Sequence, residues 1–137
     1  MSEKLPLFVY GTLRPGRRNH HRYLGAHAVA ARPAALPGAA LHAGPGFPYA
    51  LPDPGRTVLG DLITVRPAAH AQVLAALDRL EECRPEGDGL YVRERLAVTA
   101  LDTGERLDAW VYLAGPAVAA ELAAHPALIE SGDWTAA

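Results

Sequence analysis

The distribution of apolar residues in the first part of the chain predicts short strands separated by turns. Residues 5–10 form an apolar and aromatic run that ends at Gly11, which predicts a buried first strand and a sharp turn. Residues 12–25 are polar and basic, so we expect a surface segment with a short helix or loop over residues 19–22. Prolines and a glycine interrupt the apolar residues 26–41, which predicts irregular or bulged strands.

The middle and late parts of the chain add three further strands. Residues 44–55 contain four prolines, and we expect an ordered loop there. Residues 57–65 are rich in β-branched and apolar side chains and predict a core strand, in which Gly60 indicates a bulge or a close backbone approach. Residues 90–101 and 106–113 are separated by a short turn sequence and predict a β-hairpin.

Helical periodicity is clearest over residues 67–82. This segment begins with proline, has no internal glycine or proline, and carries an apolar stripe at Val73, Leu74, Leu77 and Leu80. A short alanine-rich helix is expected after Pro116, and Trp134 near the C-terminus is expected to dock against the rest of the chain.

Composition narrows the class of protein. The 137 residues, half of them hydrophobic, fit one globular domain over residues 1–137. The net charge of −2 gives no basic footprint for nucleic acid or an anionic membrane, and no apolar run is long enough to span a bilayer. Cys83 is the only cysteine and the N-terminus is polar, so we expect a cytoplasmic protein without disulfides. Lys4 is the only lysine, which disfavours Schiff-base catalysis.

The expected helix ends with two adjacent glutamates. Projection at about 100° per residue places Glu81 between Leu74 and Leu77 on the inward face, whereas Glu82 points to solvent. A carboxylate on a buried face is costly unless it is paired, protonated or faces a cavity, so Glu81 is a candidate general acid/base. A structural role fits the same position, with the carboxylate bonding nearby backbone or Arg93.

The turn after the first strand is a second candidate site. Gly11 permits close backbone approach, and consecutive N–H groups in such a turn can bind a carboxylate, although a purely structural turn fits the same residues. His20 and His21 are adjacent and diverge in regular structure, so no metal site is expected. Serine appears only near the termini, which disfavours a serine triad, and there is no phosphate or dinucleotide loop.

Four segments in order resemble the γ-glutamylcyclotransferase-like family, which includes γ-glutamylamine cyclotransferases and AIG2-like proteins. They are YGTLR at residues 10–14, LDRLE at 77–81 followed by LYVR at 90–93, AWVY at 109–112, and SGDW at 131–134. These matches extend over nearly the whole chain.

The resemblance implies an α+β fold: a small, mixed, mostly antiparallel β-barrel with a few helices. It implies that Glu81 is the catalytic acid/base and that no metal or cofactor takes part. It also implies a pocket in which the turn holds a γ-glutamyl or 5-oxoproline group. The substrate-binding residues would be Tyr10, Gly11, Thr12, Leu13 and Tyr112.

The expected function is cyclisation of the γ-glutamyl group of a small-molecule amine or peptide conjugate to 5-oxoproline, with release of the free amine, by a monomer or homodimer. The alternative is a non-catalytic member of the same fold that binds a small acidic metabolite or regulates a partner. The chain departs from the family at Glu82, where many members have glycine, and in the charged segment 83–89.

Overall fold

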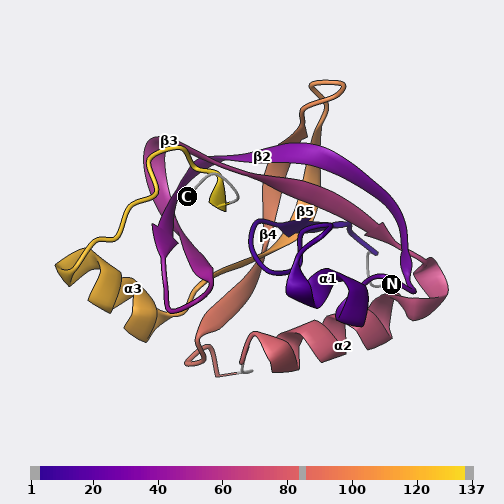
Figure 1. The fold of residues 1–137 in the computed structure, drawn as a ribbon, viewed down its shortest axis with the longest axis horizontal. Coiled ribbons are helices and arrows are strands. Elements are labelled where there is room, and N and C mark those ends of the chain that lie inside the picture. The colour runs from indigo at the N-terminus through magenta and orange to yellow at the C-terminus, as the bar shows by residue number, and fades with distance from the viewer. Residues whose placement is uncertain (1–3, 84–85, 135–137) are drawn as a thin grey trace.

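The strands close into a barrel, as Figure 1 shows. The computed structural model describes residues 4–83 and 86–134, and within them the strand order around the barrel is β1-β3-β2-β4-β5. The parallel pair joins β1 to β5, and the other neighbours are antiparallel. The mixed, mostly antiparallel barrel predicted from the sequence is confirmed. The strands are β1 (Leu7–Val9), β2 (Ala28–Ala43), β3 (Pro48–Val65), β4 (Tyr91–Ala100) and β5 (Arg106–Ala114).

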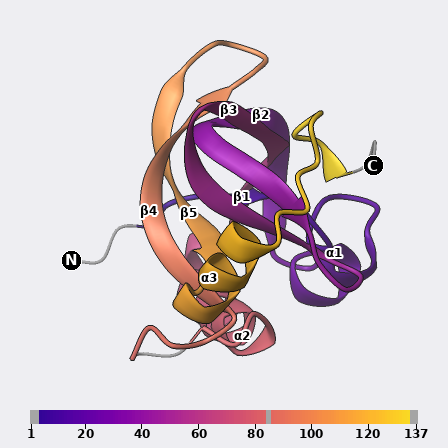
Figure 2. The same cartoon turned by 90° about the vertical axis from the view of Figure 1, so that its left-hand side faces the viewer.

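Three α-helices in the described part of the chain pack on the outside of the barrel. They are α1 (Arg18–Tyr23), α2 (His70–Leu80) and α3 (Pro116–Ala124). Figures 1 and 2 both show α2 beneath the barrel. The helix predicted over residues 67–82 is confirmed, except that a 3-10 turn forms its start and the α-helix ends at Leu80.

The loop predicted over residues 44–55 is wrong beyond residue 47, because Pro48 begins the long strand β3. The backbone N–H of Ala50 donates to the Tyr10 hydroxyl at 3.2 Å rather than to β2. Pro48 and Pro52 lie two residues to either side of Ala50, where backbone N–H groups point the same way. The prolines therefore remove no hydrogen bond from the β2–β3 ladder, and the strand tolerates them.

Strand β1 lies at the centre of the fold, because both of its faces are buried. Leu7 and Val9 pack in the cluster that joins the barrel to α2, whereas Phe8, and Tyr10 directly after the strand, pack in the barrel interior. A strand covered on both faces is expected to be continuously apolar, as this one is. A Cβ atom at Gly60 would collide with the backbone of β1, which confirms the predicted close approach.

The C-terminal tail returns to the barrel. Trp134 is partly buried against the barrel-interior cluster, and the guanidinium of Arg17 lies 5.4 Å from the centre of its ring. The predicted docking of this tryptophan is confirmed. The N–H of Leu59 in β3 donates to the carbonyl of Gly132 at 2.7 Å, which fixes the tail beside β3. No helix in the described ranges is long and apolar enough to cross a membrane.

Candidate functional site

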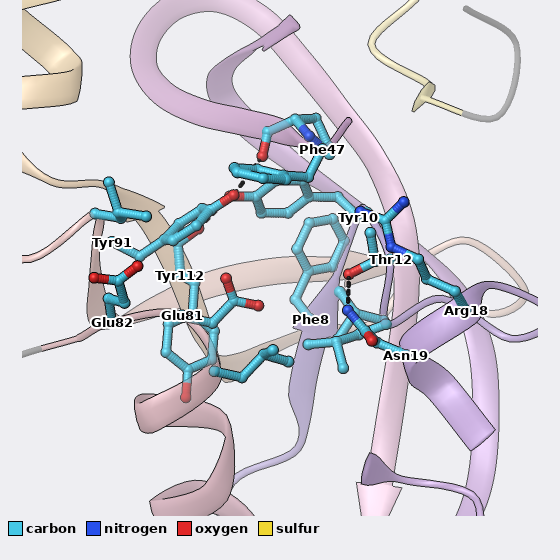
Figure 3. Close-up of a pocket in the computed structure, with 16 residues that line it drawn as sticks. Phe8, Tyr10, Thr12, Arg18, Asn19, Phe47, Glu81, Glu82, Tyr91 and Tyr112 are labelled. Carbon is cyan, nitrogen blue, oxygen red and sulfur yellow. Dashed lines mark hydrogen bonds between the residues drawn. The ribbon is translucent and has the colours of Figure 1, made fainter. Parts of the chain in front are cut away.

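A cavity of about 250 Å³ opens where the end of α2 meets the turn after β1. Figure 3 shows its walls, which come from β1, α1, the β2–β3 turn, the end of α2 and the two C-terminal strands. The structure brings every residue predicted for the site to this cavity. These residues are Glu81, Tyr10, Gly11, Thr12, Leu13 and Tyr112.

The Glu81 carboxylate is turned toward the middle of the cavity, in agreement with the inward face predicted for it (Figure 3). No hydrogen bond or ion pair of this carboxylate is found among the residues that the structure describes. The alternative partner named above, Arg93, pairs with Asp78 instead. Burial raises the pKa of Glu81 to about 7, because the charged form is poorly solvated. Such a group can accept and return a proton near neutral pH.

The prediction for Glu82 needs a correction, because α2 ends before it. Glu81 is the C-cap, and Glu82 follows in the left-handed region with φ of 49°. The N–H of Glu82 donates to the carbonyl of Arg79 at 3.2 Å, and that of Cys83 donates to Asp78 at 2.8 Å. This pair of bonds is the Schellman motif, whose left-handed position usually holds glycine. Glu82 is exposed, as predicted, but it lies on the cavity rim rather than on a helix face.

The turn after β1 presents backbone donors to the cavity. The N–H groups of Gly11, Thr12 and Leu13 have no acceptor in the described part of the chain. Asn19 in α1 holds the turn in shape: its side-chain amide donates to Thr12 Oγ1 at 2.8 Å, and its N–H donates to the Thr12 carbonyl at 2.9 Å. A Cβ at Gly11 would lie 2.9 Å from Pro48 Cδ, so a larger residue would displace the wall. Consecutive free N–H groups of this kind suit an anion such as a carboxylate.

Arg14 secures the same turn from behind. Its guanidinium pairs with Asp61 of β3 at 2.7 Å and with Asp133 of the tail at 2.7 Å. The first and last of the four sequence segments therefore meet at this ion-pair cluster. Arg14 does not line the cavity, and its contribution is to fix the position of the turn.

The hydroxyls of Tyr10 and Tyr91 are engaged in hydrogen bonds with the backbone. The Tyr10 hydroxyl donates to the carbonyl of Tyr112 and accepts from Ala50 N–H, and Tyr91 donates to the carbonyl of Pro48 at 2.7 Å. Burial raises the pKa of both Tyr10 and Tyr91, so both stay neutral. Their rings form an apolar wall that strengthens electrostatic interactions in the cavity.

Tyr112 belongs to an ionic cluster beside the cavity. Its hydroxyl donates to Asp78 Oδ1 at 2.6 Å. The same carboxylate accepts hydrogen bonds from Nε and Nη2 of Arg93 at 2.9 and 3.2 Å. The guanidinium also lies 4.6 Å from the centre of the Trp110 ring. Asp78 was not predicted as a site residue, although its place three residues before Glu81 puts it near the same helix face.

Three residues that line the cavity were not predicted as site residues. Arg18 and Asn19 lie at the start of α1, directly after the predicted turn, and Phe47 comes from the β2–β3 turn. The guanidinium of Arg18 donates to the carbonyl of Gly46 at 2.8 Å. Within residues 4–83 and 86–134, no group of three or more His, Cys, Asp or Glu side chains could hold a metal ion.

Comparisons with known proteins identify the family of the chain. Residues 7–136 match the family described as "Gamma-glutamyl cyclotransferase, AIG2-like". A curated relative, the gamma-L-glutamyl-butirosin B gamma-glutamyl cyclotransferase of Niallia circulans, is 31% identical over 107 residues. That alignment covers 78% of this chain, and the chain spans only 65% of the relative's length.

Solved structures share the fold. A crystal structure of an AIG2-like protein from Mus musculus aligns with a TM-score of 0.60 and 31% identity, over 80% of this chain and 76% of that one. YkqA from Bacillus subtilis aligns with a TM-score of 0.68 and 24% identity, over 96% of this chain and 40% of that one. With the family match over nearly its whole length, the chain belongs to the gamma-glutamyl cyclotransferase, AIG2-like family.

Proposed function

We propose that the protein converts a γ-glutamyl amine or peptide into 5-oxoproline and the free amine, with Glu81 as general acid/base. The observation that carries the proposal is the Glu81 carboxylate, which faces the cavity without a partner in residues 4–83 and 86–134 and has a pKa raised to about 7. Family membership and the name of the butirosin relative support the reaction class.

The chemistry requires folding of the substrate and movement of protons. A γ-glutamyl amide carries its own nucleophile, the α-amine, at the distance that closes a five-membered ring on the γ-carbonyl. Glu81 accepts a proton from the α-ammonium, and the free amine attacks the γ-carbonyl carbon. As the C–N bond to the leaving group breaks, the protonated Glu81 gives its proton to the leaving nitrogen. A second proton from the attacking nitrogen follows the same route, so the amine leaves as an ammonium ion.

The turn after β1 is proposed to hold the α-carboxylate of the substrate. Gly11, Thr12 and Leu13 supply the unpaired N–H groups described above, and Arg18 places a positive charge on the same side of the cavity (Figure 3). A positive charge beside free N–H donors suits a carboxylate better than the neutral carbonyl at the reacting centre. The substrate would then lie with its α-nitrogen beside Glu81.

The experiment is mass-spectrometric detection of 5-oxoproline after incubation of the protein with a panel of γ-glutamyl amines, γ-glutamyl dipeptides and glutathione. We expect product with at least one of these and a matching amount of free amine. Binding of γ-glutamyl compounds without product across the panel would contradict the proposal. It would favour the non-catalytic, metabolite-binding alternative.

A further inference from the structure

The cavity rim carries opposite charges at its two ends. Arg18 lies beside the turn, near Thr12, and Glu82 lies on the other side of Glu81 (Figure 3). The Glu82 side chain is exposed and has no ion-pair partner among the described residues. Its charge is thus available to a ligand that reaches this side of the cavity.

The geometry of cyclisation decides which part of the substrate reaches Glu82. In the ring that forms, the attacking nitrogen lies between two carbons. One of them is the α-carbon, which bears the α-carboxylate, and the other is the γ-carbonyl carbon, which bears the leaving amine. With this nitrogen beside Glu81, the carboxylate and the leaving group diverge to opposite sides of it. The carboxylate that occupies the turn near Thr12 therefore directs the leaving group toward Glu82.

The position of Glu82 in the chain brings its charge close to the reacting centre. It is the residue directly after Glu81, with the two Cα atoms about 3.8 Å apart. A long side chain at this position can reach a group several bonds beyond the leaving nitrogen. Glycine, the residue that the left-handed backbone at Glu82 favours, would provide no charge there.

We infer that Glu82 selects leaving amines that carry a second positive charge, such as α,ω-diamines and other amines with a distal ammonium or guanidinium group. This inference rests on the proposed function. The neutral or acidic leaving groups of other γ-glutamyl compounds would lack this interaction, and acidic ones would be repelled. Glu82 is thus a specificity-determining residue rather than a catalytic one.

The test compares two γ-glutamyl amides of nearly equal shape, those of 1,4-diaminobutane and n-pentylamine. They differ in a terminal ammonium against a terminal methyl group. In the wild-type protein we expect kcat/KM to favour the cationic amide by about fivefold at low salt, the size of an exposed ion-pair interaction. The ratio should fall toward one in Glu82→Gln and should also decrease as salt is added.

A matched control distinguishes the effect of the Glu82 charge at the cavity rim from the effect of the overall charge of the protein. Glu86 is an exposed carboxylate in the same loop that does not line the cavity, so Glu86→Gln removes the same charge and should keep the ratio. A ratio of one in the wild type, or a ratio that Glu82→Gln leaves unchanged, would overturn the inference while the proposed function stands. No 5-oxoproline from either amide or from the wider panel would overturn the proposed function, and the inference with it.

A stability measurement separates selectivity from a structural role. Glu82→Gly removes the steric strain of a side chain in the left-handed backbone conformation, so we expect a higher Tm. The same variant should lose the preference for the cationic amide. A lower Tm with an unchanged ratio would show that the side chain serves the fold, and would overturn the inference.

Discussion

Asp78 and Glu81 are carboxylates near the end of the same helix, three residues apart, and they differ in their hydrogen-bond partners. Asp78 accepts hydrogen bonds from two nitrogens of Arg93 and from the hydroxyl of Tyr112. These bonds fix the end of α2 to β4 and β5. Glu81 faces the cavity with no such partner in the described part of the chain. A buried carboxylate without a partner costs free energy of folding, whereas a paired one stabilises its neighbours.

The difference separates structural from chemical roles. The paired carboxylate has its hydrogen-bonding positions occupied, so it positions the helix end and is closed to substrate. The unpaired one keeps its lone pairs available, and burial raises its pKa to about 7, close to the working pH of a general base. The ionic cluster of Asp78, Arg93 and Tyr112 fixes the end of α2, and this keeps the Glu81 carboxylate at the cavity.

The largest effect is expected from Glu81→Gln. Turnover of a γ-glutamyl amide should fall by about 10³-fold, since amide nitrogen and oxygen cannot replace a general acid/base. The same variant should be more stable than the wild type at pH 8, by about 2 kcal/mol, because it removes an unpaired buried charge. Steady-state kinetics and urea unfolding measure the two quantities.

The pH dependence of that stability difference has a defined sign. The folded-state pKa of Glu81 is raised from 4.5 to about 7, so the folded protein holds the proton more tightly than the unfolded chain does. The wild type therefore keeps its full stability below pH 4.5 and loses part of it as the pH rises to 7. A wild type that is as stable as Glu81→Gln at pH 8 would mean that the carboxylate has a stabilising partner.

Asp78→Ala should act mainly on the fold. It leaves the partly buried guanidinium of Arg93 and the hydroxyl of Tyr112 without their shared acceptor, and we expect a loss of about 2 kcal/mol in the free energy of unfolding. Activity should fall by about tenfold, because the end of α2 shifts and carries Glu81 with it. Asp78→Asn keeps an acceptor for the Tyr112 hydroxyl, so it should lose less unfolding free energy and less activity than Asp78→Ala. Equal losses in the two variants would argue against a positioning role.

Tyr112→Phe should have the smallest effect. It removes a single hydrogen bond to Asp78 while the bonds from Arg93 remain, so we expect a loss of about 1 kcal/mol in unfolding free energy. The ring still lines the cavity, and kcat/KM should change by less than about threefold. A loss of activity as large as that of Glu81→Gln would show that the Tyr112 hydroxyl takes part in the chemistry.

The sequence predicted much of the fold because its strongest signals are local. The apolar run of β1, the stripe of α2 and the turn between β4 and β5 each depend on residues near one another in the chain. The prolines after residue 47 misled the prediction, because their effect depends on which way each N–H points. That direction is set by pairing with β2 and by the distant Tyr10 hydroxyl.

The candidate site was predictable only in part. Helical periodicity placed Glu81 inward, and the resemblance named the turn and Tyr112, which the barrel brings together. The role of Asp78 depends on Arg93, which lies 15 residues later on strand β4, and no helical or strand periodicity indicates that pairing. Periodicity also failed at Glu82, because a helix projection does not hold beyond the C-cap.

The central claim is that the unpaired Glu81 carboxylate acts as the base. The most direct measurement is kcat/KM of the wild type on a turned-over γ-glutamyl amide across pH 5 to 8.5. If Glu81 is the base, activity rises about tenfold per pH unit at low pH and levels off above about pH 7, the raised pKa of this group. Activity that stays constant over the whole range would contradict the claim.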